Sequence, residues 1–293
     1  MKTCYGAFAK VSDYVTLTKP RIVLLLLVTA LAAMFLAAQS VPPLSLMILV
    51  LGAGALAAGG ANALNHYLDR DIDQQMHRTR HRPVPSKRIG PHSALIFGIL
   101  LNLLALLIFS LWVNPLSGVI AVGATLFYVL VYTVWLKRST PQNIVIGGAA
   151  GAVPPLVGWA AVTGGVSLPA LYLFAIIFFW TPPHFWALAL LLRDDYARAG
   201  VPMLPVVTSP EETSRQIFLY TLLLTAVTIL FHLTGRTGWI YLTSALLLGA
   251  LFLALAGYLL RSNSARGARA VFYYSMVYLS AIFAALVVDT LVP

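Results

Sequence analysis

The chain has 293 residues, of which 60% are hydrophobic and only 10% are charged, whereas about a quarter of the residues in a soluble domain are charged. This composition predicts an integral membrane protein. It excludes a secreted enzyme, a soluble nucleotide-binding fold and a disordered scaffold. The single cysteine, Cys4, excludes a disulfide framework and a cysteine-based zinc site. The net charge of +10 at pH 7 is better explained by membrane orientation than by binding of nucleic acid.

Nine stretches are long and apolar enough to cross a bilayer, which takes about 20 residues of helix. Together they use nearly all of the apolar residues and leave no room for a soluble domain. Residues 1–20 are polar and are expected to form a short arm that is not a cleaved signal peptide. We therefore predict a single all-α membrane domain over residues 1–293, with nine transmembrane helices at residues 21–39, 44–66, 92–112, 115–136, 143–163, 168–192, 214–233, 238–260 and 270–291.

Basic residues segregate between the two sets of connections. Eighteen of the 19 Lys and Arg residues lie in the arm and in alternate connections, whereas Arg236 alone lies in the other set. The positive-inside rule places the first set in the cytoplasm. We therefore expect a multi-pass protein of the cell inner membrane with a cytoplasmic N-terminus, cytoplasmic loops at 67–91 and 193–213, and a periplasmic C-terminus.

Nearly all acidic residues follow the same partition, although Asp and Glu contribute little to topology. Asp289 is the one acidic residue near the other face. An active site that faces the cytoplasm would explain this distribution.

Asn65, Asp69 and Asp73 follow one another at intervals of four residues. On a helix they share one face, where the two carboxylates repel each other unless a cation lies between them. Oxygen ligands of this kind suit Mg²⁺, which usually takes one or two carboxylates together with substrate phosphates. The alternative interpretation is a solvated helix end with Arg70 as an ion-pair partner.

A basic run follows this acidic cluster. Arg78 and Arg82 are the preferred diphosphate ligands, because guanidinium groups bind phosphate oxygens through two donors. The run also has a simpler explanation, since it holds the loop in the cytoplasm.

These two clusters together resemble the first Asp-rich motif of the UbiA superfamily of intramembrane prenyltransferases, and more narrowly its protoheme IX farnesyltransferase branch, the haem O synthases. The resemblance rests on Asn62, Asn65, Asp69, Asp71, Asp73, Arg78, Thr79, Arg82 and Pro83. It implies a bundle of nine helices with a cytoplasmic active site. It also implies that Asp69, Asp73, Arg78 and Arg82 are catalytic.

The connection after residues 115–136 carries a second motif. The resemblance implies that Tyr132, Lys137 and Arg138 help to hold the prenyl diphosphate. Without it, Tyr132 is equally well explained as an aromatic residue of the membrane interface, and the Lys–Arg pair as a determinant of orientation.

Residues 143–163 are rich in glycine and alanine and contain Pro154 and Pro155. Small residues predict close packing with neighbouring helices, and the prolines predict a kink. A wall for a long isoprenoid tail is the functional alternative.

Residues 168–192 contain His184 and Trp186 within a stretch that closely resembles the haem O synthases, and these two residues are candidates for haem binding. A histidine inside a membrane is a functional candidate by default. The alternative is a structural histidine hydrogen-bonded to a neighbouring helix near Pro182 and Pro183.

The wider superfamily often carries a second Asp-x3-Asp motif after this helix, but this chain offers only the adjacent pair Asp194 and Asp195. Asp194 is the candidate for a further Mg²⁺ ligand, beside Asn65, Asp69 and Asp73.

The resemblance implies transfer of a farnesyl group from farnesyl diphosphate to a vinyl group of protohaem IX, with addition of water, to give haem O for respiratory haem-copper oxidases. The implied cofactor is Mg²⁺. The implied partners are the two substrates, membrane lipid and a downstream haem-modifying enzyme or oxidase assembly, without nucleic acid. Two alternatives stay open: prenylation of a quinone precursor such as 4-hydroxybenzoate, and transport. Transporters tend to place charges near the middle of the membrane, and these helices are nearly free of charge.

Overall fold

The computed structural model describes residues 2–292, with side chains from Lys10 onward, and this part of the chain is helical without a strand. Within it, nine helices are long and apolar enough to cross a membrane, which confirms the all-α fold predicted from composition. The membrane helices are α2 (Pro20–Ala38), α3 (Leu44–Leu68), α5 with η1 (Pro91–Ile108, Phe109–Val113), α6 with η2 and α7 (Pro115–Leu126, Phe127–Leu136, Lys137–Ser139), α8 with α9 (Asn143–Ala152, Pro154–Thr163), α10 (Leu168–Leu191), α13 with η3 (Pro210–Leu230, Phe231–Thr234), α14 (Trp239–Ser262) and α15 (Ala265–Leu291). Four further short or peripheral helices are α1 (Lys2–Thr18), α4 (Arg70–Gln75), α11 (Arg193–Arg198) and α12 (Leu204–Val207).

Capping residues explain why two membrane helices begin earlier than hydropathy predicts. The Ser209 side chain accepts a hydrogen bond from the Glu212 N–H, and the Ser264 side chain accepts one from the Gly267 N–H. Each serine satisfies a backbone donor that a helix start leaves free. Helices α13 and α15 therefore include polar first turns that lie outside the apolar stretches predicted at 214–233 and 270–291.

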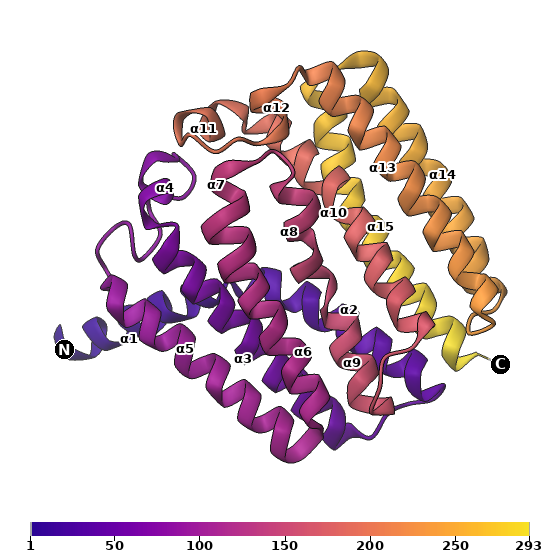
Figure 1. Ribbon diagram of the computed structural model, residues 1–293, viewed down its shortest axis with the longest axis horizontal. Helices are drawn as coiled ribbons and strands as arrows, with labels where there is room; N and C mark the ends of the chain where they lie inside the picture. The colour runs from indigo at the N-terminus through magenta and orange to yellow at the C-terminus, as the bar shows by residue number, and fades with distance from the viewer. Residues whose placement is uncertain (1, 293) are drawn as a thin grey trace.

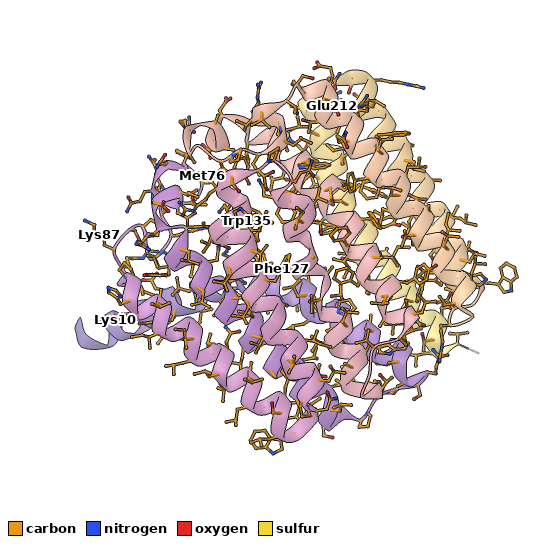
Figure 2. All side chains as sticks on the ribbon, in the orientation of Figure 1. Lys10, Met76, Lys87, Phe127, Trp135 and Glu212 are labelled. Atoms are coloured by element: carbon orange, nitrogen blue, oxygen red, sulfur yellow. The ribbon has the colours of Figure 1, made fainter. Side chains whose placement is uncertain are left out.

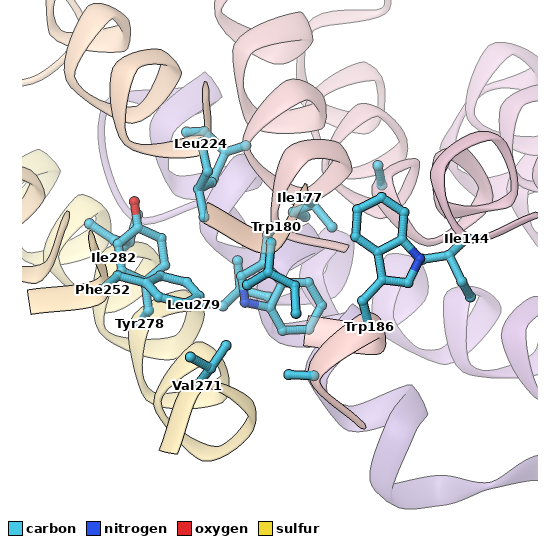
Figure 3. Packing of buried hydrophobic residues seen from close by; sticks show 14 of the residues in the cluster. Ile144, Ile177, Trp180, Trp186, Leu224, Phe252, Val271, Tyr278, Leu279 and Ile282 are labelled. Atoms are coloured by element: carbon cyan, nitrogen blue, oxygen red, sulfur yellow. The ribbon is translucent and has the colours of Figure 1, made fainter. Parts of the chain in front are cut away.

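The helices form a closed bundle in which the first membrane helix packs against the last. Helix α2 contacts α3, α9 and α15, and the later helices α10, α13, α14 and α15 pack against one another (Figure 1). Trp180, Leu224, Phe252 and Tyr278, one from each of these later helices, meet in the apolar core that Figure 3 shows.

Glycines let several helix pairs approach closely. A Cβ at Gly158 of α9 would lie 2.2 Å from the Ala30 carbonyl oxygen of α2, and one at Gly98 of α5 would lie 2.9 Å from the Gly60 carbonyl oxygen of α3. Residues 143–163 also break as the prolines predict, since α8 ends at Ala152 and α9 begins at Pro154. The expected close packing and kink are therefore present in this segment.

The arm before the first membrane helix is itself helical, which hydropathy did not indicate. The Asn62 side chain donates to the Thr18 carbonyl at 3.2 Å, Arg88 pairs with Asp13 at 2.9 Å, and the Tyr14 ring meets the Phe97 ring edge-on at 4.9 Å. These contacts hold α1 against α3 and α5. The chain then turns into α2 through a single residue in the left-handed region, Lys19, with φ 52° and ψ 60°.

Polar connections gather along one edge of the bundle. Figure 1 places α4, α7, α11 and α12 along that edge and the C-terminus at the opposite corner. In Figure 2, Lys87 and Glu212 mark the same edge. The loops predicted at 67–91 and 193–213 are thus neighbours in space, although more than a hundred residues separate them in the chain.

Candidate active site

The junction of α3 and α4 provides the three side chains of the acidic motif. Helix α3 ends at Leu68, yet the Asp69 N–H donates to the Asn65 carbonyl and the Asp73 N–H donates to the Asp69 carbonyl, both at 2.8 Å. The four-residue helical register therefore continues into α4 and keeps the three side chains on one side. Asn65, Asp69 and Asp73 are all at most 3% exposed, so these side chains lie inside the protein rather than at a solvated helix end.

Three cationic side chains from separate segments reach this buried group. Arg82 Nη1 lies 2.9 Å from both carboxylate oxygens of Asp73, and Lys137 Nζ donates to Asp69 Oδ2 at 2.5 Å. Lys19 Nζ donates to Asn65 Oδ1 at 2.9 Å. The loop after α4, the start of α7 and the junction between α1 and α2 therefore meet at one point.

The environment of Lys19 is unusual for a lysine. Burial, followed by the positive charges of Arg82 and Lys137, lowers the pKa of Lys19 to about 7. No motif marks Lys19 in the sequence, because this residue lies in the polar arm. Only its position next to Pro20, at a helix start, is visible in the sequence.

One oxygen of the acidic cluster is left without a partner. Asp69 Oδ2 accepts from Asn65 Nδ2 at 2.6 Å and from Lys137, whereas Asp69 Oδ1 is buried and has no hydrogen-bond partner among the side chains that the structure describes. A buried carboxylate oxygen without a donor is energetically unfavourable. This oxygen fits a hard divalent cation such as Mg²⁺, and Asn65 Oδ1 and the Asp73 carboxylate offer further oxygen ligands nearby.

A metal held by protein side chains alone is not indicated. In the described part of the chain, no three His, Cys, Asp or Glu side chains converge in a way that could hold a metal ion. Mg²⁺ commonly completes its ligand set with substrate phosphates and water. The cluster therefore fits a metal that binds together with a phosphate-bearing substrate.

Asp71 and Arg138 form a separate pair on the outside of the cluster. Arg138 reaches both carboxylate oxygens of Asp71, at 2.7 and 2.8 Å, and also donates to the Leu68 carbonyl at 2.9 Å. This hydrogen bonding lowers the pKa of Asp71, which is 55% exposed, to about 2. Arg138, predicted as a diphosphate ligand, is thus engaged by Asp71, while its neighbour Lys137 points into the cluster.

Tyr132 lies on η2, where the membrane helix takes the wider π form. Its ring stacks on Tyr128 with centroids 5.4 Å apart. Thr133 Oγ1, one residue further, accepts from Asn65 Nδ2 at 3.2 Å and donates to the Tyr128 carbonyl. A Cβ at Gly147 of α8 would lie 2.2 Å from the Tyr132 ring, so this glycine makes room for the stacked pair beside the acidic cluster.

The second acidic pair meets the basic loop through Asp195, not Asp194. Asp194 is exposed, whereas Asp195 is 9% exposed and pairs with Arg198. Although burial alone raises the pKa of Asp195, hydrogen bonds from Arg198 and from the backbone of Arg78 and His77 bring it below its ordinary value. The residue predicted as a further metal ligand is therefore the solvated member of the pair, and its neighbour anchors the segment that carries Arg78.

Arg78 also lies beside Tyr196. Burial raises the pKa of Tyr196, and the charge and hydrogen bond of the Arg78 guanidinium oppose that shift. The predicted diphosphate ligand is itself exposed. Arg78 therefore sits where the two polar loops meet, at the rim of the buried cluster.

His184 packs between helices α10 and α15. Its ring stacks between Trp180 and Phe272, with centroid distances of 4.4 and 4.8 Å, and its Nδ1 lies 2.7 Å from Ser275 Oγ. This is the hydrogen bond to a neighbouring helix that the structural interpretation expects. Trp186, the other haem candidate, is 1% exposed and packs on the edge of Tyr220, within the core shown in Figure 3.

A fully buried histidine lies beside the acidic cluster. His66 is 1% exposed, follows Asn65 directly, and has both ring nitrogens without a hydrogen-bond partner among the described side chains. A buried imidazole that has no partner is rare in folded proteins. His66 is therefore a polar group of this region that the acidic spacing alone did not reveal.

Comparison with known proteins places the chain in a family. The model of the UbiA prenyltransferase family matches residues 26–282. A protein of Gloeobacter violaceus named protoheme IX farnesyltransferase is 50% identical over 285 residues, which cover 97% of this chain and 93% of that protein. A protein of Roseiflexus sp. (strain RS-1) with the same name is 50% identical over 287 residues, or 98% of this chain. The chain spans about half the length, 54%, of this second relative.

Solved structures show the same fold. The chain superposes on a digeranylgeranylglyceryl phosphate synthase with a TM-score of 0.80 at 20% identity, covering 96% of this chain and 99% of that one. It superposes on a UbiA homologue from Archaeoglobus fulgidus, bound to GPP and Mg²⁺, with a TM-score of 0.67 at 17% identity, covering 94% of this chain and 99% of that one.

Proposed function

Because this chain belongs to the UbiA prenyltransferase family, we infer that it transfers a farnesyl group from farnesyl diphosphate to a vinyl group of protohaem IX. Addition of water completes the product, haem O, and diphosphate is released. The diphosphate half of this proposal is supported by the buried cluster of Asn65, Asp69 and Asp73 with its three cations. The acceptor half is supported by the relatives at about 50% identity that are named protoheme IX farnesyltransferase.

The single observation that carries the reaction class is the excess of cations around buried carboxylates. Arg82 and Lys137 balance the charges of Asp73 and Asp69. Lys19, whose pKa is about 7, brings the cations into excess when an entering anion favours its protonated form. A prenyl diphosphate brings a polyanion into this site, and negative charge grows on its leaving oxygen as the allylic C–O bond breaks. Cations that are already in place stabilise this charge more strongly in the transition state than in the bound substrate.

Each cation contributes in its own way. Arg82 uses one terminal nitrogen for Asp73, which leaves the other guanidinium donors for phosphate oxygens. Lys19 and Lys137 act as point charges held by Asn65 and Asp69. Arg78, at the rim, would guide the diphosphate into the site.

Mg²⁺ fits the oxygen ligands of Asn65, Asp69 and Asp73, and when bound it would neutralise diphosphate charge as a Lewis acid. The A. fulgidus homologue binds GPP together with Mg²⁺, which supports a metal-dependent reaction. Asp194 is solvated, so we assign it no direct contact with the ion.

The reaction also requires that the allylic cation is protected from water, and the aromatic pair next to the acidic cluster suits this role. An allylic cation must be kept from water until the acceptor attacks it, and aromatic faces attract cations. Tyr128 and Tyr132 are stacked and joined to Asn65 through Thr133. We assign them to shelter the farnesyl cation until a vinyl carbon of the haem attacks it.

The hydrogen bonding of His184 limits how this side chain could bind the haem acceptor. Its Nδ1 is held by Ser275, so only Nε2 is left for haem iron. Histidines that bind metals usually have their second ring nitrogen held in this manner. His184 therefore serves as an iron ligand through Nε2 or as a packing residue, and spectroscopy of the haem-bound protein separates the two roles.

We place the protein in the cell inner membrane with the acidic cluster toward the cytoplasm, where farnesyl diphosphate is available. The charge partition supports this orientation. The product would pass to a haem-modifying enzyme or to assembly of haem-copper oxidases.

The decisive experiment supplies the purified protein with Mg²⁺, farnesyl diphosphate and protohaem IX. The expected product is a more hydrophobic haem that is heavier by one farnesyl group and one hydroxyl group, found by mass spectrometry. Asp69→Asn is the inactive control. A parallel reaction with 4-hydroxybenzoate tests the rival acceptor: a prenylated hydroxybenzoate without a haem product would overturn the proposed acceptor and leave the reaction class standing.

A further inference from the structure

The side of the bundle formed by α13 and α14 carries a hollow that the proposed reaction does not use. It has a volume of about 510 Å³ and lies between Phe218 on α13 and a row of residues on α14. That row follows the helical repeat, so it occupies one face. The lining residues are Phe218, Leu253, Ala254, Gly257, Tyr258 and Arg261.

Gly257 forms the floor of the hollow. A Cβ at this position would meet only Phe218, at 3.8 Å. The space above the glycine is therefore open and not filled by a neighbouring helix. Every lining side chain is apolar or aromatic except Arg261, which stands at the end of α14 nearest the polar edge of the bundle.

The charge of Arg261 is not balanced by the protein. Among the described residues, no ion pair joins Arg261 to a carboxylate. Arg215, at the same end of α13, is different because it pairs with Glu212 at 3.1 Å. A cation without an ion-pair partner among the described residues thus stands at the polar-edge end of an apolar hollow.

We propose that this hollow binds one anionic phospholipid, with an acyl chain against Gly257 and Phe218 and the phosphate on Arg261. Guanidinium groups bind phosphate through two donors. Basic residues at pockets between membrane helices select anionic headgroups. The apolar length below Arg261 fits an acyl chain, and the single unpaired cation fits one phosphate.

Farnesyl diphosphate fits the hollow less well. Its diphosphate needs several cations or a metal, which the cluster at the end of α3 offers and the hollow does not. Helices α13 and α14 also lie on the opposite side of the bundle from α3 and α5 (Figure 1). The lipid site is therefore separate from the proposed active site, and its test does not depend on the proposed function.

The test uses native mass spectrometry of the full-length protein in detergent, with equal amounts of phosphatidylglycerol and phosphatidylcholine that carry the same acyl chains. Wild-type protein should retain one phosphatidylglycerol about fivefold better than phosphatidylcholine, the ratio that one arginine contact near the surface supplies. Arg261→Gln should retain the two lipids equally. Gly257→Leu, which fills the hollow, should lose the retained lipid, and Ala254→Leu provides a second variant that fills it independently.

Arg266→Gln is the matched control, because Arg266 is an exposed arginine of the first turn of α15 that does not line the hollow. It should keep the wild-type preference. The proposal is overturned if Arg266→Gln removes the preference as fully as Arg261→Gln, or if both filling variants retain phosphatidylglycerol normally. Displacement of the lipid by farnesyl diphosphate, or a wild-type dimer that Gly257→Leu dissociates, would assign the hollow to another occupant and also overturn it.

Discussion

The carboxylate of Asp69 shows how one residue divides its two oxygens between structure and function. Oδ2 joins Lys137 and Asn65, whereas Oδ1 is buried without a partner. A group buried in this state is tolerated where a ligand completes it. The unpaired oxygen of Asp69 therefore marks the place where we propose that the metal and the diphosphate bind.

Substitutions in the acidic motif should distinguish the buried carboxylates of Asp69 and Asp73 from the exposed carboxylate of Asp71. Asp69→Asn and Asp73→Asn should each lower kcat by at least about a hundredfold, because each removes charge that organises the diphosphate site. Asp71→Asn is the matched control: Asp71 is exposed and pairs outward with Arg138, so its loss should change kcat by less than about fivefold. Steady-state kinetics with purified protein provide the measurement. A larger effect at Asp71 than at Asp69 would contradict the assignment.

Lys19 allows a second test at single-residue scale. Lys19→Met removes the charge and the hydrogen bond to Asn65, and should raise KM for farnesyl diphosphate about tenfold or more, since hydrogen bonds to charged groups are strong. Lys19→Arg should retain most of the affinity. Lys10→Met, in the exposed part of α1, is the control for the charge of the arm. An unchanged KM together with reduced thermal stability in Lys19→Met would show a purely structural role.

The site was only partly predictable from the sequence, for a physical reason. Asn65, Asp69 and Asp73 share one local helical register, so their spacing alone predicts a common face. Lys19 and Asp195 join the site through contacts with segments that are distant in the chain, and no local pattern records such contacts. For the same reason sequence reasoning favoured Asp194 over Asp195 and grouped Arg138 with Lys137.

The helices, like the site residues, were predictable where a local sequence pattern determines them and not where distant contacts do. The nine membrane helices were predicted because hydrocarbon requires every spanning backbone group to bond within a long apolar helix. Helices α1, α4 and α11 are polar or short. Contacts with distant segments hold them: Arg88 pairs with Asp13 of α1, Arg138 pairs with Asp71 of α4, and backbone groups of the basic loop hydrogen-bond to Asp195 of α11. Hydropathy carries no information about such contacts.

The packing of α8 against η2 gives a prediction for a whole element. Gly147→Ala would drive a methyl group into the Tyr132 ring, because the Cβ would lie 2.2 Å from it. We expect a loss of about 2 kcal/mol in unfolding free energy, typical of overpacking, and reduced activity as the stacked tyrosines shift.

Gly151 on the same helix provides the control, since a Cβ there meets nothing within 4 Å. Gly151→Ala should leave stability unchanged or raise it by less than about 1 kcal/mol. Thermal unfolding in one detergent measures both variants. Equal stability of the two would show that Tyr132 moves aside freely and that Gly147 does not position it.

At the scale of the whole molecule, the closed bundle places most charged residues and the candidate site at the same edge. Helix α15 packs on α2, and the segments that carry Lys19, Arg82 and Lys137 reach the buried cluster at the end of α3 from separate parts of the chain. The acidic cluster, the basic loops and the second acidic pair all lie at this edge (Figures 1 and 2). One orientation in the membrane therefore determines which compartment supplies the diphosphate and which face the C-terminus meets.

This orientation is testable by labelling single cysteines in intact cells, in a background where Cys4 is replaced by serine. Positions 86 and 209 are exposed residues of the polar edge, and positions 40 and 292 are exposed at the opposite edge. Because eighteen of the 19 Lys and Arg residues lie on the first side, the positive-inside rule places that side in the cytoplasm.

A membrane-impermeant maleimide should label Ser40→Cys and Val292→Cys in intact cells, and Ser86→Cys and Ser209→Cys only after the inner membrane is opened. Labelling of positions 86 and 292 from the same side would contradict a chain that crosses the bilayer nine times. Labelling of all four with the sides exchanged would leave the fold intact and place the acidic cluster outside the cell membrane, where cytoplasmic farnesyl diphosphate does not reach it.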